Sequence, residues 1–242
     1  MHKSFDALTR VLKSVSSAYE KLGTNRLWWR GQAKQGWNLN PKVYRNDYTA
    51  WHEYDFIYNF EQQAPVRYPN WPDDKSRQLL LMQHYGLPTR LLDWSQSLFT
   101  ALYFAVCNKK KDDKNGSLWA LHFQKLNSLQ TGHAYGYHDK MKEAQELIDS
   151  AFQKVNERQQ TGNILAMTGP QVDLRMLVQS AAFTIHGSRT PLNELPDKDQ
   201  FLTEIIIEEE EKRFVREALA ISGFSRSQLF PDLDSLAKNL IS

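Results

Sequence analysis

The chain has 242 residues, of which 41% are hydrophobic and 24% are charged, with a formal net charge of +2 at pH 7. This length allows a substantial core, and the nearly balanced charge gives no support for a dedicated nucleic-acid binder. Cys107 is the one cysteine, which excludes an internal disulfide and favours a reducing, cytoplasmic compartment. We expect its thiol to be a small buried apolar group, with a nucleophile as the alternative. The sequence shows no signal-peptide core and no apolar stretch of membrane-spanning length, so we expect a soluble protein without a membrane partner.

The first 70 residues predict two helices around a short strand. Apolar side chains at three-and-four spacing indicate helices over residues 4–22 and 51–68. Between them, residues 27–30 have the composition of an aromatic strand that stops at Gly31. A glycine at this point would let a ligand or another backbone approach closely.

Arg30, at the end of this strand, is open to two interpretations. It could pair with a carboxylate at the edge of the core or stack on Trp37, as a structural arginine does. It could instead anchor a phosphate, because the guanidinium fork matches paired oxygens. Arg45 is a second cation in the following loop, and Glu53 on the second helix could form a salt bridge with either arginine.

Residues 83–105 form the stretch around which we expect the fold to be organised. One helix should end at Gly86, a short strand has room at 89–94, and a second helix should begin with Ser95 or Ser97 as its cap. Loops on rigid elements are where sites are usually found. The connection would hold five polar residues close together: His84, Thr89, Arg90, Asp93 and Ser95.

The middle of the chain alternates between a strand and a polar segment. Residues 117–124 predict a strand, whereas residues 125–161 are polar and mostly helical. We interpret about 125–165 as an insertion beside the core, which could form a lid or a partner surface. Its histidines lack a helical metal-ligand spacing, so no metal site is expected. Residues 162–172 are expected to be a loop.

The last third of the chain predicts two more strands and two helices. Residues 175–186 form an apolar run interrupted by Gln179, whose amide must find partners if it is buried. A second strand is expected at 201–207. An acidic run at 208–211 begins a helix, since negative charge favours a helix N-terminus. A final helix is expected at 233–240.

Several common catalytic motifs are absent from the sequence. It contains no GxxxxGK[ST] loop and no GxGxxG loop, so phosphate cradles of those kinds are unsupported. It also lacks HExxH, a CxxC pair and GxSxG, so the sequence does not support the commonest zinc sites or the commonest serine-hydrolase active site. Together the patterns predict an α+β fold, with a mixed sheet flanked by helices.

Five segments together resemble the FRG domain, a family named for an aromatic-Arg-Gly motif. They are WWRGQ at 28–32, LNPKVYR at 39–45, QHYGLPTRLLDWS at 83–95, ALYFA at 101–105 and RMLVQSAAFTIHG at 175–187. The resemblance covers roughly residues 25–240 and is interrupted at about 125–165. It implies one FRG domain over residues 1–242, with a helical insertion at about 125–165. The family occurs mostly in bacteria and their phages, and its biochemistry is largely uncharacterised.

A more distant similarity links the chain to ADP-ribosyltransferases of the Arg-Ser-Glu type. In those enzymes an aromatic-Arg-Gly strand holds the NAD phosphates, a second strand supplies a serine, and a third carries the catalytic glutamate. Arg30 matches the first element and Ser95 the second. The third resembles the segment from Gln179, but Ala181 stands where the glutamate would be. Asp93, or Glu194 in the following loop, would then have to supply the carboxylate.

This resemblance implies a role for each candidate residue. His84 and Asp93 would be catalytic and would transfer protons. Five residues would bind the nucleotide in one cleft: Arg30, Gly31, Arg90, Ser95 and Gln179. The implied protein is an ADP-ribosyltransferase-like bacterial or phage toxin or defence effector, with NAD as a possible substrate and a protein or nucleic acid as its target. No cofactor is assigned, and the missing glutamate leaves enzymatic activity open.

Two alternatives remain on the residues alone. The cleft could be a binding module that recognises a nucleotide or another phosphorylated ligand without turnover. Alternatively, Arg30, Arg90 and Asp93 could form a buried ion-pair network that holds the fold, with function in the segment at about 125–165.

Overall fold

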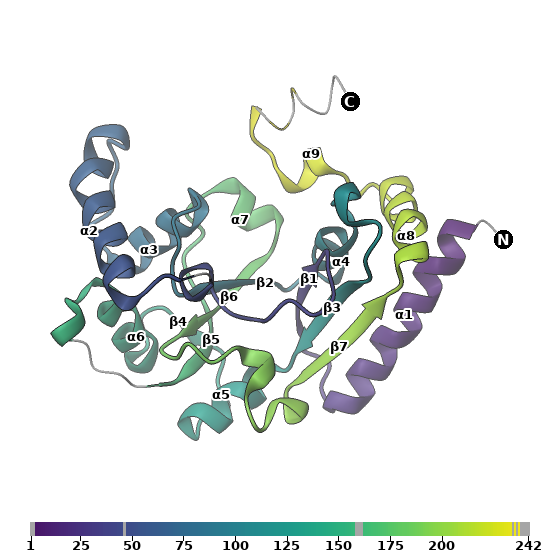
Figure 1. Cartoon of the computed structure of the whole chain (residues 1–242), viewed down its shortest axis with the longest axis horizontal. Helices are drawn as coiled ribbons and strands as arrows, with labels where there is room; N and C mark the ends of the chain where they lie inside the picture. Colours follow the sequence, from purple (N-terminus) through teal and green to yellow (C-terminus); the bar gives the residue numbers. More distant parts are fainter. Residues whose placement is uncertain (1–2, 46, 158–161, 234, 236, 238–242) are drawn as a thin grey trace.

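The computed structural model describes residues 3–45, 47–157 and 162–233, together with residues 235 and 237. The described residues form an α+β fold in which one seven-stranded mixed sheet is flanked by helices (Figure 1). The strand order is β4-β5-β6-β2-β1-β3-β7, and only the β4–β5 pair is parallel within this sheet. The predicted fold class is therefore confirmed.

The strands are β1 (Trp28–Gln32), β2 (Leu91–Ser95), β3 (Gly116–Leu121), β4 (Tyr137–His138), β5 (Ile164–Thr168), β6 (Ala181–His186) and β7 (Leu202–Ile207). The helices are α1 (Lys3–Leu22), α2 (Ala50–Arg67), α3 (Lys75–His84), α4 (Leu98–Val106), α5 (Phe123–Thr131), α6 (Lys142–Phe152), α7 (Leu174–Val178), α8 (Glu209–Ile221) and α9 (Arg226–Leu229).

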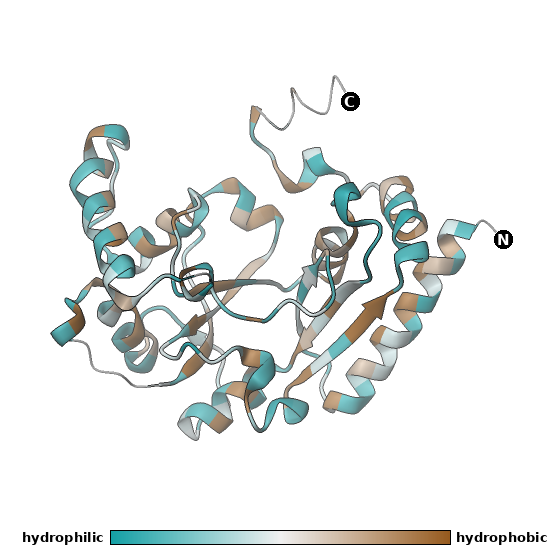
Figure 2. Ribbon diagram, viewed as in Figure 1, coloured by the Kyte–Doolittle hydropathy of each residue, from teal (hydrophilic) through white to brown (hydrophobic). Residues whose placement is uncertain are grey.

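Helices α1, α4 and α8 cover the half of the sheet formed by β1, β3 and β7. The apolar residues of α1 recur every three or four positions, so one face of the helix is buried against α8 and β7. Figure 2 shows that the ribbon of β7 is largely hydrophobic, whereas hydrophobic and hydrophilic residues alternate along α1 and α8. Burying one leucine or valine of such a face stabilises the fold by roughly 1.5–3 kcal/mol.

Helices α2, α3 and α6 pack against the other half of the sheet. The segment at 125–165 is not a body beside the core, because it supplies α5, β4 and α6 to the layers of the fold. Leu147 and Ile148 of α6 are 2% and 1% exposed, and they pack in the same cluster as Leu91 and Ile185 of the central strands.

Two other expectations for the second half of the chain were wrong. Residues 162–172 contain β5, an interior strand whose apolar run Ile164–Met167 is buried between β4 and β6. Residues 175–186 do not form one strand, because the short helix α7 occupies the start of this segment. Gln179 caps the end of α7, and Ser180 has a positive φ of 48°, so the chain turns sharply before β6 begins.

Most other element expectations are confirmed. Ser97 caps α4, accepting a hydrogen bond from the amide of Thr100, and Gly86 ends the turn after α3 with a φ of 86°. The expected final helix at 233–240 falls largely outside the described residues. None of the helices in the described ranges combines the length and the apolar composition needed to cross a membrane.

Candidate functional site

A cleft opens where two neighbouring strands of the sheet separate. β1 and β2 pair at a single position, Trp29 opposite Ser95, whereas each strand stays paired along five positions with its other neighbour. A cavity of about 830 Å³ lies at this separation. Residues of both strands line it, together with residues from α3 and α7 on one side and from α4 on the other.

Gly31 allows β1 to lie directly against the backbone of α4. A Cβ atom at this position would lie 1.9 Å from the carbonyl oxygen of Ala101 and 2.6 Å from the amide nitrogen of Ala105. Any side chain would therefore push the helix away from the strand. The glycine of the aromatic-Arg-Gly motif is required by another backbone in this structure, and Gly31 itself also lines the cleft.

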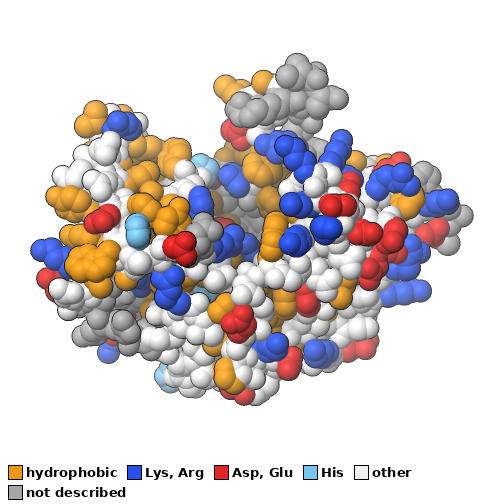
Figure 3. All heavy atoms as spheres, viewed as in Figure 1, with side chains coloured by type: hydrophobic (Ala, Val, Ile, Leu, Met, Phe, Trp, Pro, Cys, Tyr) orange, Lys and Arg blue, Asp and Glu red, His pale blue; other side chains and the backbone are white. Residues whose placement is uncertain are grey.

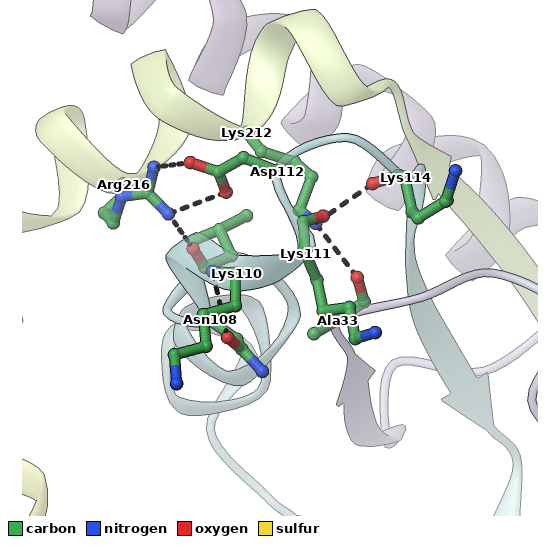
Figure 4. A network of polar contacts seen from close by, with 9 residues as sticks. Ala33, Asn108, Lys110, Lys111, Asp112, Lys114, Lys212 and Arg216 are labelled. Atoms are coloured by element: carbon green, nitrogen blue, oxygen red, sulfur yellow. Dashed lines mark hydrogen bonds and ion pairs between the residues drawn. The ribbon is translucent and has the colours of Figure 1, made fainter.

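The chain that follows β1 is held by a buried lysine on α8. The ammonium group of Lys212 donates hydrogen bonds to the carbonyl oxygens of Ala33 at 2.9 Å and Lys114 at 3.0 Å, and also to that of Lys111 (Figure 4). The Lys212 side chain is fully buried, and desolvation lowers its pKa. Lys212 thus joins α8 to the segment after β1 and to the loop that precedes β3.

The guanidinium of Arg30 bridges the two separating strands. Its Nη1 donates a hydrogen bond to the backbone oxygen of Asp93 at 2.6 Å, in the region where the ladder between β1 and β2 has ended. Its Nε is buried and has no hydrogen-bond partner among the described residues. Burial lowers the pKa of Arg30 to about 10, with Asp93 raising it and Arg45 lowering it. Arg30 therefore stays charged at neutral pH and keeps a donor unused.

The cleft carries more positive than negative charge. Arg45 and Arg175 also line it, whereas Asp93 supplies the one carboxylate among its described lining residues. Arg45 donates from Nε to the oxygen of Asn40 at 2.9 Å, and burial lowers its pKa. The guanidinium of Arg175 lies over a phenylalanine ring at the rim. Three guanidinium groups around one carboxylate favour an anionic ligand.

The carboxylate of Asp93 is held in place by an amide. Gln83 donates from Nε2 to both carboxylate oxygens, at 3.1 and 3.0 Å, and its Oε1 accepts a hydrogen bond from Thr89 at 2.7 Å. Gln83 was not among the residues that the sequence proposed for the site. It opens the motif that resembles the FRG domain, but its amide could have bonded to many groups, so its partner could not be known in advance.

His84 lines the cleft beside Gln83. Its Nδ1 contacts a carboxylate oxygen of Asp173, the residue that caps α7 by accepting from the amide of Met176 at 2.8 Å. Asp173 therefore orients the imidazole and begins α7 at the same time. Its role was not expected from the sequence, because the two residues are far apart in the chain.

Ser95 and Gln179 both line the cleft, as expected, but their side chains bond to backbone. Ser95 Oγ donates to the carbonyl oxygen of Gln179 at 2.7 Å and accepts from the amide of Ser97 at 2.9 Å. Gln179 Nε2 donates to the oxygen of Leu229 at 2.8 Å. The two residues thus tie β2, α7 and α9 together at the edge of the cleft.

Arg90 does not line the cleft, contrary to expectation. It is 3% exposed, and its guanidinium donates to the carboxylate of Glu53 at 2.8 and 2.7 Å and to Ser150 Oγ at 2.6 Å. Burial alone would lower the pKa of Arg90, but the charge of Glu53 and its hydrogen bond to the guanidinium, together with Tyr44, raise the pKa. The salt bridge expected for Glu53 is therefore confirmed, but its partner is Arg90 rather than Arg30 or Arg45.

Cys107 and Glu194 are poorly placed to act as a nucleophile and as a catalytic carboxylate, respectively. Cys107 is half-buried at the end of α4 and lines the cleft, but burial raises the pKa of its thiol, which disfavours the nucleophilic thiolate. Glu194 is not among the lining residues, and its Oε1 accepts a hydrogen bond from Asn38 Nδ2 at 2.8 Å. Ala181, where a catalytic glutamate was sought, does line the cleft. Asp93 is thus the carboxylate that remains.

The described residues include no group of three or more histidine, cysteine, aspartate or glutamate side chains that could hold a metal ion.

No curated protein and no solved structure gives a significant match to this chain. A family model does match: residues 25–114 correspond to the FRG domain. The matched range contains β1, β2 and α4, and with them Arg30, Asp93 and the separation of the two strands. Residues 25–114 therefore match the FRG domain, and this range supplies Arg30 and Asp93 to the lining of the cleft.

Proposed function

We propose that the cleft binds a nucleotide that carries a diphosphate, with NAD as the first candidate. The observation that supports this best is the buried Nε of Arg30, which is charged and has no partner among the described residues. A buried donor without a partner costs free energy that a ligand oxygen would recover. Arg45 and Arg175 add positive charge around the same space, and a diphosphate presents oxygens to several guanidinium groups at once.

The proposed reaction is transfer of ADP-ribose from NAD to a nucleophile. The bond between nicotinamide and the ribose C1′ breaks, and its electron pair leaves with nicotinamide. A new bond forms between C1′ and an oxygen or nitrogen of the acceptor, which loses its proton to a base in the cleft. Asp93 is positioned by Gln83 for the carboxylate role, and His84, oriented by Asp173, is positioned to accept a proton. Water as the acceptor would give simple NAD hydrolysis.

A second candidate is a binding module that holds the nucleotide without turnover. The engagement of Ser95 and Gln179 with backbone groups favours it, because the hydroxyl proton of Ser95 and an amide N–H of Gln179 are already used within the protein. Asp93 would in that case position the ligand rather than assist a reaction.

The binding test is a thermal-shift titration with NAD, ADP-ribose, ATP and inorganic pyrophosphate. A ligand of the native state raises the melting temperature further as its concentration increases, by mass action. We expect stabilisation of the wild type that is lost in Arg30→Ala and kept in Arg10→Ala, whose guanidinium pairs with Glu211 outside the cleft. No shift with any of the four compounds would contradict the nucleotide proposal.

The test of turnover is the release of nicotinamide from NAD, measured by chromatography. We expect release by the wild type and its loss in Asp93→Asn, which keeps the size of the side chain but removes the charge. Binding of NAD without any release would favour the binding module. Release that survives Asp93→Asn would show that another group supplies the carboxylate role.

The proposal extends to the domain and its setting. β5, β6 and β7 lie outside the matched range but belong to the same sheet, which supports one domain over residues 1–242 with its added segment at about 125–165. The resemblances alone support the proposal of a toxin or defence protein of bacterial or phage origin that acts on a protein or nucleic acid. The single cysteine supports a cytoplasmic location.

A further inference from the structure

Helix α2 stands at one end of the molecule, opposite α1 (Figure 1). Within the described residues it packs chiefly on α6, and a groove of about 560 Å³ runs along another of its faces. Hydrophobic side chains gather over this end of the molecule (Figure 3). The wall that faces α2 across the groove is formed by Tyr68, Trp71, Tyr85 and Leu87.

The groove face of α2 combines an apolar base with a polar crest. Phe56 and Phe60 are half-buried and Ala64 is buried, so these residues form the base. The crest consists of four exposed residues, each four positions after the last: Asp55, Asn59, Gln63 and Arg67. Residues at this spacing lie on one face of a helix. The crest covers 12 residue steps, or about 18 Å of helix.

The four crest residues run in the order acid, amide, amide, base, so the crest is complementary to a second copy of itself that runs in the opposite direction. If a second copy of α2 lies antiparallel across the groove, with the two-fold axis midway between Asn59 and Gln63, acid meets base and amide meets amide. Asp55 then faces the partner subunit's Arg67, and Asn59 faces the partner subunit's Gln63. A symmetric dimer forms each of these contacts twice, because both subunits present the same patch.

We propose that α2 is the interface of a symmetric dimer of this chain, with the two α2 helices packed antiparallel over their grooves. Within the part of the chain that the structure describes, the crest side chains make no hydrogen bond or ion pair to another element. The described hydrogen bonds of Asn59 and Arg67 are made to backbone oxygens within α2 itself, Asp55 and Gln63 respectively. The aromatic base and wall supply the apolar area, and the crest sets the register. The proposal is independent of the nucleotide-binding function.

The test is sedimentation of charge-reversal variants over a range of concentrations. Asp55→Arg would place two arginines against each other at both ends of the interface, and Arg67→Asp would place two aspartates there. Two favourable pairs then become two repulsive pairs, so the dissociation constant of the dimer should rise about tenfold or more. The double variant D55R/R67D restores both pairs in reversed order and should recover the dimer.

Mixing the two single variants tests whether the crests face each other. The Asp55→Arg chain then presents arginine at both ends of its crest, and the Arg67→Asp chain presents aspartate at both ends. Together they should form a heterodimer, although each alone is largely monomeric. Glu20→Arg, an equal charge reversal at an exposed position of α1, is the control and should leave dimerisation unchanged.

Three results would overturn the proposal. The first is a wild type that stays monomeric up to a few hundred micromolar, which would leave the groove to another partner. The second is a dimer that neither single reversal weakens. The third is a double variant that fails to recover the dimer while its circular dichroism and melting temperature match those of the wild type.

Discussion

The guanidinium of Arg30 donates to the backbone oxygen of Asp93 at 2.6 Å, at the point where β1 and β2 cease to pair. The Arg30 side chain thus connects β1 and β2 where the backbone hydrogen bonds between these two strands have ended. The same contact places the cation within a few ångströms of the carboxylate-bearing residue of the cleft. Arg30 is therefore both a structural bridge and the best candidate for binding an anion.

Replacing Arg30 by lysine should separate these two roles. Lysine keeps a positive charge but lacks the planar fork, so it cannot bridge to Asp93 and hold a ligand oxygen at the same time. We expect the affinity for the nucleotide to fall at least about tenfold and the free energy of unfolding to fall by about 1–2 kcal/mol. Isothermal titration calorimetry and urea denaturation measure the two effects. An unchanged affinity in Arg30→Lys would show that its fork is not used by the ligand.

Removing the buried ion pair at Arg90 should cost far more stability. Arg90→Ala leaves the carboxylate of Glu53 buried beside α6 without this partner. We expect a loss of about 3–5 kcal/mol in the free energy of unfolding, measured in urea. Arg10→Ala is the matched control, because its ion pair with Glu211 is largely exposed and should contribute less than about 1 kcal/mol. Similar losses in both variants would refute the assignment of Arg90 to the core.

Gly31→Ala should destabilise the fold without touching a charged group. The added methyl would lie 1.9 Å from the oxygen of Ala101, so β1 and α4 must move apart. We expect a cost of about 3 kcal/mol or more, seen as a lower melting temperature. Gly136→Ala is the control, since its Cβ would meet only a ring carbon of Phe123 at 3.1 Å, and that side chain can move. Equal melting temperatures for the two variants would contradict the close approach.

Stability should depend on pH through His186. This histidine is fully buried, with Nε2 2.8 Å from Thr184 Oγ1. Desolvation, together with the charges of Arg30 and Arg90, lowers its pKa to about 3. The unfolded chain therefore binds a proton that the folded chain does not, once the pH falls below the ordinary value of about 6.5.

The contribution of His186 is thus fully present above about pH 6.5 and is lost progressively as the pH falls toward 3. Its slope is at most about 1.4 kcal/mol per pH unit. Urea denaturation between about pH 5 and pH 7 should show a shallower slope in His186→Gln than in the wild type. His133→Gln, on an exposed loop, is the control. Identical slopes in His186→Gln and the wild type would show that His186 titrates normally.

Local patterns determined much of the fold. The spacing of apolar residues in 4–22 predicts α1, because a helix can bury one face only at that period. Ser97 and Gly86 mark helix ends, because their conformational and hydrogen-bonding preferences act within a few residues. The motif around Arg30 likewise indicated the FRG domain, which the family match at 25–114 confirms.

Only the tertiary structure decided which groups meet. Arg30, Arg45 and Arg90 are chemically alike in the sequence, yet one bridges two strands, one lines the cleft rim and one is buried against Glu53. β5 could not be told from a loop, because a short apolar run is explained only by the neighbouring strands that bury it. Most residues of the candidate site could thus be predicted from the sequence. Their hydrogen-bond and ion-pair partners could not, because these depend on how remote segments of the chain pack together.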